Sequence, residues 1–303
     1  MQSLKIGLLL GWRQIQRASL STNLLIVFVM MLTFLNLIAV SGILVGLIVG
    51  AEVAVREKSL GDMIITARDD ENHILETERF VRELSAYPEV SAYSVRYKGA
   101  GVLEANYQFR RDLSGERDIA NVTVTGIDPV AEEGMTGLSE ELIAGEYLTP
   151  TDEGKILLGA LYTKEYASNY GDIFETIEDI SVGDTVRLTS GSITKEFVIK
   201  GIVQSKVDEV SLNTYIPERE FRRLFNRIDR NADQIVVRLD VPEESQDLKT
   251  AMVDSGLDDL AKIQTYEEGV PKFLTAIQNT MNLLGTLIGS LGRVVASITI
   301  FTI

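Results

Sequence analysis

The stretch ASLSTNLLIVFVMMLTFLNLIAVSGILVGLIVGA, residues 18–51, has no charged side chain in thirty-four positions. A helix needs roughly 20 apolar residues to cross a hydrocarbon core about 30 Å thick. A cleavable signal peptide has a shorter apolar region, of roughly 7–15 residues. We therefore predict a transmembrane helix that continues beyond the bilayer as a stalk, together covering residues 18–60.

The charges on either side of this run predict its orientation. Residues 1–17 carry Lys5, Arg13 and Arg17 and no acid, whereas the chain from Glu52 onward carries all 44 acidic residues. Basic residues that flank a span stay on the cytoplasmic side. We expect a cytoplasmic N-terminus and an acidic main domain on the periplasmic or extracellular side of the cell (inner) membrane. Nucleic acid is excluded as a partner because phosphate binding needs a basic face.

Residues 1–17 are predicted to form a cytoplasmic amphipathic helix. Trp12, Arg13 and Arg17 suit the headgroup layer of the lipid bilayer, where an aromatic ring and long cationic side chains both find partners. We interpret these three residues as membrane-interface anchors. The helix serves as a topology signal or contacts a cytoplasmic partner.

Two helical faces in the apolar ends are predicted to pack against each other in antiparallel fashion. In the first, glycines recur every four residues and allow a close approach of two helices. In the second, apolar residues from Leu274 to Ile298 keep an unbroken 3-4 spacing. A dimer seam is the alternative use of the glycine face. The predicted helix-packing residues are Gly42, Gly46, Gly50, Leu284, Ile288 and Leu291.

Residues 269–303 are predicted to form a second stalk helix and the start of a second transmembrane helix. Arg293 stands alone among apolar residues. An unpaired charge in the middle of a bilayer costs several kcal/mol, so we place Arg293 as an anchor near the outer headgroups. The run ends at Ile303 before a span is complete, and we expect the chain to be part of a longer protein.

The region between the apolar ends has a mixed α/β pattern. Apolar spacing predicts a helix over residues 74–86, and alternation or β-branching predicts strands that include Val90–Tyr97, Val102–Phe109 and Gln234–Leu239.

The same region has no catalytic signature. The chain contains no Cys, which excludes disulfides and thiolate metal sites. Its single histidine, His73, is expected to be a solvated residue at a helix start, without the partners of a catalytic or metal site. No glycine-rich phosphate loop is present. We predict no enzyme activity, no cofactor and no metal.

Several short segments, in this order along the chain, resemble the MacB/FtsX-type (MacB/LolC/FtsX) ABC-transporter permeases. They are Gly61–Thr66, Tyr87–Val90, Val124–Pro129, Ile143–Leu148, Ile156–Gly159 and Val182–Val186. The resemblance covers nearly the whole chain. It implies an α+β fold: a membrane-anchored mixed α/β ectodomain of two subdomains, the second inserted in the first, between two long transmembrane or stalk helices. The implied boundaries are 61–129 plus 230–268 for the membrane-proximal subdomain and 130–229 for the outer, inserted one.

The resemblance also implies a function. Such permeases couple ATP hydrolysis by a cytoplasmic ABC ATPase to work by the extracytoplasmic domain, a mechanism called mechanotransmission. They pair as homodimers or heterodimers with a second permease in the lipid bilayer, and some act with an extracytoplasmic partner protein. The architecture alone also fits a two-span membrane sensor with an extracellular ligand-binding domain, or a scaffold protein without an ATPase.

Overall fold

The structure is a computed structural model of the 303-residue chain. It describes residues 19–109 and 117–269, and the single positions 13, 283, 285, 286, 289 and 290. The chain divides into two compact units. One comprises Met1–Gly50 and Val270–Ile303, and the other comprises Ala51–Gly269.

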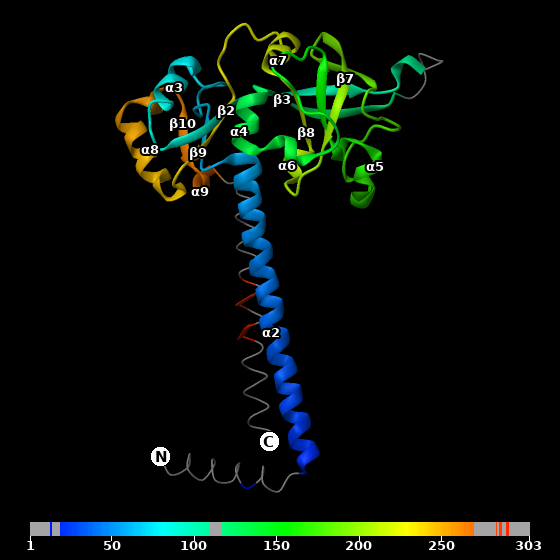
Figure 1. The fold of residues 1–303 in the computed structure, drawn as a ribbon, viewed down its shortest axis with the longest axis vertical. Coiled ribbons are helices and arrows are strands. Elements are labelled where there is room, and N and C mark those ends of the chain that lie inside the picture. Colours follow the sequence, from blue (N-terminus) through cyan, green and yellow to red (C-terminus); the bar gives the residue numbers. More distant parts are fainter. Residues whose placement is uncertain are drawn as a thin grey trace. The chain divides into compact units, whose positions relative to one another are not determined.

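The long uncharged run forms α2, Leu20–Val55, a helix of 36 residues that Figure 1 draws as one continuous ribbon. At 1.5 Å per residue it is about 54 Å long. Among its described side chains, large apolar residues such as Phe28 and Leu47 are exposed. A search confined to the described residues finds no helix that is long and apolar enough to cross a membrane.

The Ala51–Gly269 unit is built on ten strands in the order β10-β1-β9-β2-β3-β8-β5-β7-β4, with β6 pairing with β2 and β7 off this path. The strands are β1 Met63–Thr66, β2 Val90–Glu104, β3 Ile119–Ile127, β4 Leu142–Gly145, β5 Lys155–Gly159, β6 Thr185–Ser190, β7 Ile193–Val203, β8 Asn213–Pro217, β9 Gln234–Leu239 and β10 Lys262–Thr265.

Helices cover this sheet and connect its strands. The α-helices are α3 Thr77–Leu84, α4 Pro129–Thr136, α5 Lys164–Ala167, α6 Asp208–Ser211, α7 Glu218–Leu224, α8 Ser245–Asp254 and α9 Tyr266–Gly269. Short turns include the π-helical η1 Arg56–Leu60 and the 3-10 segments η2 Tyr107–Phe109, η3 Leu138–Glu141, η4 Ala160–Tyr162, η5 Ser168–Ile173, η6 Pro242–Glu244 and η7 Leu257–Asp259. The predicted mixed α/β class is thereby confirmed.

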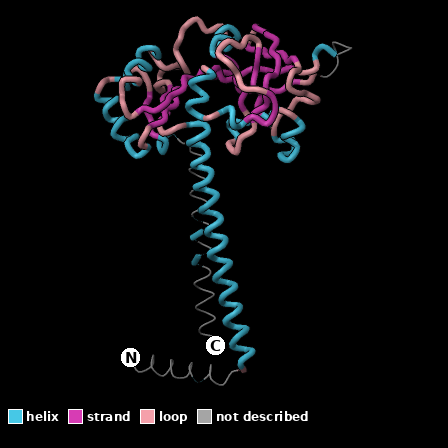
Figure 2. The backbone as a smooth tube through the Cα atoms, in the orientation of Figure 1, coloured by secondary structure: helices cyan, strands magenta, loops and turns pink. Residues whose placement is uncertain are grey.

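One long strand, β2, is shared by two β structures. Its first half pairs with β9 as far as Arg96, in an open sheet with β1 and β10. Its second half, from Tyr97, pairs with β3 and β6. Because β6 also pairs with β7, the strands β2-β3-β8-β5-β7-β6 close into a ring. Figure 2 shows the two groups of strands on either side of the end of the long helix.

The sequence pattern predicts two strands, Val90–Tyr97 and Val102–Phe109, where the structure has the single strand β2, which includes Gly99 and Gly101. The glycines serve close packing. A Cβ on Gly99 would lie 2.3 Å from the Phe225 ring, and one on Gly101 would lie 3.2 Å from the Thr189 carbonyl oxygen. The strand therefore continues through both glycines and keeps both β structures on one backbone.

The surroundings of His73 differ from the prediction. Its Nδ1 lies 2.6 Å from Asp233 Oδ1, and its side chain is about one-third exposed. The N-cap position of α3 is Glu76. His73 therefore joins two loops that are far apart in the sequence, rather than capping a helix in solvent. The predicted helix 74–86 is also shorter, since α3 covers Thr77–Leu84.

Two hydrophobic clusters fill this unit. The larger one extends through both β structures and includes Phe80, Phe197 and Phe221. The smaller one is centred on Ile127, Leu138, Leu157 and Tyr215, and Ala54 and Val55 pack against it. The last turn of α2 is therefore seated on a core of its own.

Candidate functional site

A densely hydrogen-bonded polar site lies where α2 ends. There the helix widens into the π-helical turn η1, which closes with a hydrogen bond of 2.9 Å from the Gly61 amide to the Arg56 carbonyl oxygen. Gly61 has φ +69°, and a Cβ there would lie 2.5 Å from the Val237 carbonyl oxygen. Only glycine fits this turn. Single π-helical turns are frequent at functional sites.

We call this site the stalk junction. It consists of η1, the last turn of α2 and the side chains that hold them. Those side chains are Asp62, Arg96, Glu132, Glu140, Glu141, Arg238 and Tyr266. All of them belong to the Ala51–Gly269 unit.

On its buried side, the junction holds a two-pronged ion pair. Arg96 Nη2 lies 2.6 Å from Glu132 Oε1, and Arg96 Nε donates to Oε2 at 3.0 Å. The third guanidinium nitrogen, Nη1, donates to the Ser59 carbonyl oxygen at 2.8 Å. Ser94 and Thr136 hydroxyls complete the acceptor set of the carboxylate. One guanidinium thus joins β2, α4 and the end of the stalk helix.

The local environment keeps this pair charged. Burial alone would raise the pKa of Glu132, but the Arg96 cation and the hydrogen bonds to the carboxylate leave that pKa below its ordinary value. Burial alone would likewise lower the pKa of Arg96, but the charge of Glu132 outweighs it and the pKa is raised. Bidentate Arg–carboxylate pairs also fix relative orientation, because both groups are planar.

A second set of contacts joins the end of α2 and η1, at the start of the unit, to α9 at its end. Arg56 Nε lies 2.6 Å from Asp62 Oδ1, and Asp62 Oδ2 accepts a hydrogen bond from the Leu239 amide at 2.8 Å. The Tyr266 amide donates to the Asp62 carbonyl oxygen, and the Tyr266 hydroxyl donates to the Glu52 carbonyl oxygen at 3.2 Å. The Arg56 guanidinium also lies 5.7 Å from the centre of the Tyr266 ring. α9 is therefore tied directly to the last turns of the stalk helix.

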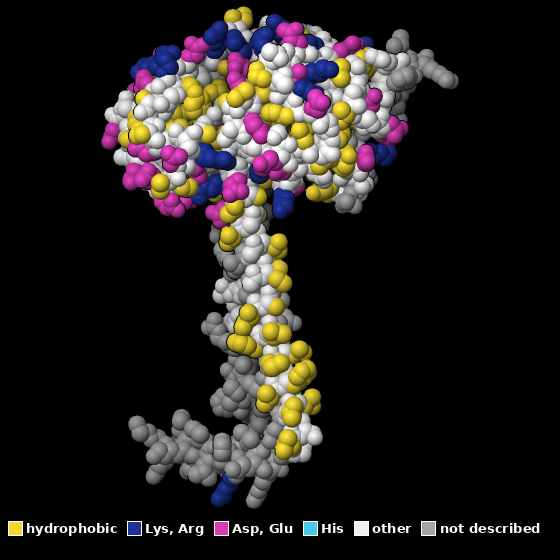
Figure 3. Space-filling model, in the orientation of Figure 1, with side chains coloured by type: hydrophobic (Ala, Val, Ile, Leu, Met, Phe, Trp, Pro, Cys, Tyr) yellow, Lys and Arg dark blue, Asp and Glu magenta, His cyan; other side chains and the backbone are white. Residues whose placement is uncertain are grey.

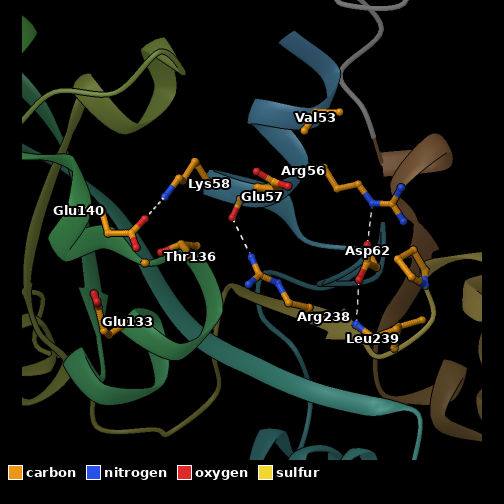
Figure 4. Close-up of a pocket in the computed structure, with 12 residues that line it drawn as sticks. Val53, Arg56, Glu57, Lys58, Asp62, Glu133, Thr136, Glu140, Arg238 and Leu239 are labelled. Carbon is orange, nitrogen blue, oxygen red and sulfur yellow. Dashed lines mark hydrogen bonds and ion pairs between the residues drawn. The ribbon is translucent and has the colours of Figure 1, made fainter. Parts of the chain in front are cut away.

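The exposed side of the junction is an open groove of about 620 Å³, shown in Figure 4. Lys58 Nζ lies 2.8 Å from Glu140 and 3.3 Å from Glu141. Across the groove, Arg238 donates to the Glu57 carbonyl oxygen at 2.9 Å. Partial burial lowers the pKa of Lys58, but hydrogen bonds to the two glutamates outweigh that effect and raise it overall.

This arrangement fixes the end of a helix. The charged side chains that hold η1 pair with one another or with backbone groups. In the part of the chain that the structure describes, no group of three His, Cys, Asp or Glu residues is placed to hold a metal ion. The junction can hold the stalk helix in both position and rotation, because β2, β9, α4 and η3 all contact η1.

The structure of this chain is similar to several solved structures. No known protein family and no curated protein matches the chain by sequence. The structure is similar to the periplasmic region of MacB from Actinobacillus actinomycetemcomitans. The identity is 18%, the TM-score is 0.49, and the match covers 74% of this chain and 96% of the MacB chain.

A second similar structure is the extracellular domain of the ABC-type transporter YknZ from Gram-positive bacteria. Its identity is 11%, its TM-score is 0.44, and the match covers 67% of this chain and 99% of the YknZ chain. Both are extracytoplasmic domains of the kind that the sequence segments resemble.

The predicted helix-packing residues lie in the other unit. Gly42, Gly46 and Gly50 are exposed within α2, and a Cβ on any of them would meet no described atom within 4 Å. The other three predicted packing residues lie outside the described residues: Leu284, Ile288 and Leu291. The packing of the two helices stays a prediction.

The predicted membrane-interface anchors are likewise untested. Arg13 is helical and exposed. Trp12, Arg17 and Arg293 lie outside the described residues.

The junction residues were missed by sequence reasoning, although one signal was present. Ser94, Arg96 and Lys98 alternate with Tyr93, Val95 and Tyr97 in a predicted strand. Such alternation normally marks a solvated polar face, so the charged face gave no reason to expect burial. Here that face is covered by η1 and α4, and Arg96 is 5% exposed.

Proposed function

We propose that the chain is a permease subunit of an ABC transporter of the MacB/FtsX-like type, which couples ATP hydrolysis by a cytoplasmic partner to work by its extracytoplasmic unit. The observation that carries the proposal is the stalk junction. A helix that served only as a tether would need no buried ion pair at its end. The ordered series of sequence segments that resemble this family adds independent support.

The junction suggests how a displacement would be passed on. Helical segments act as semi-rigid spacers, whereas glycine-rich linkers behave as random coils. A shift or rotation of α2 would move Ser59, and through Arg96 it would move β2. Because β2 belongs to both the open sheet and the closed ring, both would be moved from a single point of contact. α9 would move together with the stalk helix, because it is joined to that helix through Arg56, Asp62 and Tyr266.

The proposal includes a topology and partners. The uncharged run 18–51 would anchor the chain in the cell membrane with a cytoplasmic N-terminus, since basic residues precede it and acidic residues follow it. The subdomains would be 61–129 plus 230–268 and 130–229. A cytoplasmic ABC ATPase would supply the energy, and a second permease would complete a homodimer or heterodimer.

The test is to interrupt the helical connections without touching the folded unit. In the complete transporter with its ATPase, three glycines are inserted directly after Gly50, the residue that precedes the folded unit, and three more near Lys272. The matched control carries three glycines at Gly191, a hairpin tip whose added Cβ would meet nothing within 4 Å. We expect ATP hydrolysis to persist in both variants, because the ATPase is a separate partner.

Substrate-directed work should fall sharply in the stalk variant and stay unchanged in the hairpin control. If the stalk variant performs that work as well as the parent does, force transmission through the stalk helices is refuted. The Ala51–Gly269 unit would then be a passive docking surface. Hydrolysis of ATP by the purified chain alone, abolished by a point substitution within it, would overturn the permease assignment itself.

A further inference from the structure

The helical run formed by α5 and η5 presents an apolar surface to solvent. Tyr170 is 40% exposed and Ile173 is 75% exposed. Both belong to the 3-10 segment η5, in which side chains three residues apart lie above one another on the same face. The half-buried ring of Phe174 follows directly, and its centre lies 5.6 Å from that of the Tyr170 ring. We call these three side chains the apolar ridge.

The residues that flank the apolar ridge hold it against the closed ring of strands. Ile177 is fully buried, its amide donates to the Tyr162 carbonyl oxygen at 2.9 Å, and its carbonyl oxygen accepts from the Lys164 amide at 3.1 Å. The Glu175 carboxylate accepts from the backbone amide and the side-chain amide of Asn121, at 2.9 Å and 2.7 Å. A surface that is already ordered loses little conformational entropy on binding, which favours association.

The segment that carries the apolar ridge has an excess of negative charge. Residues 164–180 contain five acidic residues and one basic residue, Lys164, which forms an ion pair with Glu178. Glu165 and Asp179 are exposed and have no ion-pair partner among the described residues. Both line a groove of about 560 Å³ between α5 and the loop that leads to β6. A cation that entered this groove would find two carboxylates that the unit itself does not neutralise.

A further carboxylate lies beside the apolar ridge. The Tyr170 hydroxyl donates to Asp208 Oδ1 at 3.5 Å, and Asp208 forms no ion pair within the described part of the chain. In Figure 3, hydrophobic and acidic side chains lie next to one another at the lower right of the unit, the region where Figure 1 labels α5. The surface therefore has an apolar centre and an acidic rim.

We propose that the apolar ridge and its acidic rim form a docking site for a segment of a partner protein in which Lys or Arg flanks an apolar side chain. Protein interfaces commonly combine an apolar centre with a polar rim, and tyrosine is enriched among the residues that dominate binding. The unpaired carboxylates attract a cationic segment and repel the phosphate groups of anionic lipids. The inference does not rest on the proposed function, because it uses none of the contacts of the stalk junction.

The test is site-specific photo-crosslinking of the complete protein in the cells that produce it. Benzoylphenylalanine replaces Ile173, which keeps an apolar side chain on the ridge. The matched control carries the same probe at Ile228, an isoleucine that is 88% exposed in the loop between α7 and β9. The control reports how often a probe on any exposed part of the unit captures a protein by chance.

The contribution of charge is tested with two pairs of substitutions. The Ile173 probe is combined with Glu165→Lys and Asp179→Asn, since asparagine tolerates the positive φ of +46° at position 179. The control pair, Glu244→Lys and Asp254→Asn, makes the same change of net charge at exposed positions at the two ends of α8. Because all four side chains are exposed, each variant should keep the melting temperature of the parent.

We expect a protein adduct from the probe at position 173 that is absent from the probe at position 228. Its yield should fall at least fivefold with the Glu165→Lys and Asp179→Asn pair and stay within twofold with the control pair. Mass spectrometry should place the adduct on a partner peptide with Lys or Arg next to an apolar residue. The proposal is overturned if position 173 gives no protein adduct or an adduct on lipid or glycan. It is equally overturned if the adduct forms as well at position 228, if its yield does not respond to the first pair more than to the control pair, or if the partner peptide lacks a basic residue.

Discussion

The stalk junction contains two ion pairs of the same chemistry in opposite surroundings. Arg96–Glu132 is buried, with side chains 7% and 2% exposed, whereas Lys58–Glu140 lies at the rim, with side chains 23% and 72% exposed. Removing one residue of a buried ion pair leaves the other charge unpaired in a low-dielectric site. Removing one residue of an exposed pair leaves a charge that water can solvate. The junction therefore combines a buried ion pair that is costly to break with an exposed ion pair that costs little to break.

The two pairs also grip different elements. Arg96 reaches back from β2 to the Ser59 carbonyl oxygen, so it holds the backbone of η1. Lys58 reaches forward from η1 to η3, through a flexible side chain only. Substitutions at the two pairs should therefore differ in their effect on stability and in their response to salt and pH.

The largest effect is expected from Glu132→Ala. This change leaves the Arg96 cation buried and unpaired, and we expect a loss of about 3–5 kcal/mol in the free energy of unfolding. Urea unfolding followed by far-UV circular dichroism measures it. The matched control, Glu140→Ala at the rim, should lose far less, because its exposed carboxylate is screened by water. Equal losses in the two variants would contradict the distinction between buried and exposed pairs.

An intermediate effect is expected from acid. The pKa of Glu132 is lowered in the folded protein from its ordinary value of 4.5. The unfolded chain therefore takes up the proton first as the pH falls, so the stability that this group contributes is complete above pH 4.5 and is lost below it. Melting temperatures measured from pH 6 down to pH 3 should fall less steeply for Glu132→Gln than for the parent. Parallel curves would show that this carboxylate does not drive the acid sensitivity.

The smallest effect is expected from Lys58→Met, which removes the rim pair and keeps the length of the side chain. The raised pKa of Lys58 means that its contribution is present below its ordinary pKa of 10.5 and is lost as the pH rises through the folded value. At pH 7 we expect a loss of about 0.2–1 kcal/mol that shrinks further at 1 M salt, where screening acts over about 3 Å. A loss as large as that of Glu132→Ala would mean that the rim pair is structural.

Local patterns were sufficient to place many elements. The alternation and β-branching of Gln234–Leu239 predicted β9 at its observed bounds, and Gly61 marked the end of the stalk helix where the structure ends it. These elements are set by neighbouring residues, through side-chain period and the φ preference of glycine. The mixed α/β class follows from the same patterns and is confirmed.

β2 shows where local reasoning failed. The sequence pattern predicts two separate strands here, whereas the structure has one. Gly99 and Gly101 lack side chains at the positions where the Phe225 ring and β6 pack against the strand. Residues 218–230 and 185–190 come much later in the chain, so no window around Gly99 contains the reason for its presence. The β4 strand, Leu142–Gly145, was missed for a similar reason, since its pairing with β7 overrides a polar neighbourhood.

The sequence by itself determined the long uncharged helix, its end at Gly61 and the class of the following unit, because helix length, charge and period are local properties. Only the tertiary structure decided that Arg96 is buried and that Glu132, thirty-six residues further on, is its partner. It also decided that Arg96 donates a hydrogen bond to the Ser59 carbonyl oxygen. A charged residue in an alternating strand is favourable on a solvated face and costly on a covered one. Which face is covered depends on how distant segments pack, and that information is absent from any single stretch of the chain.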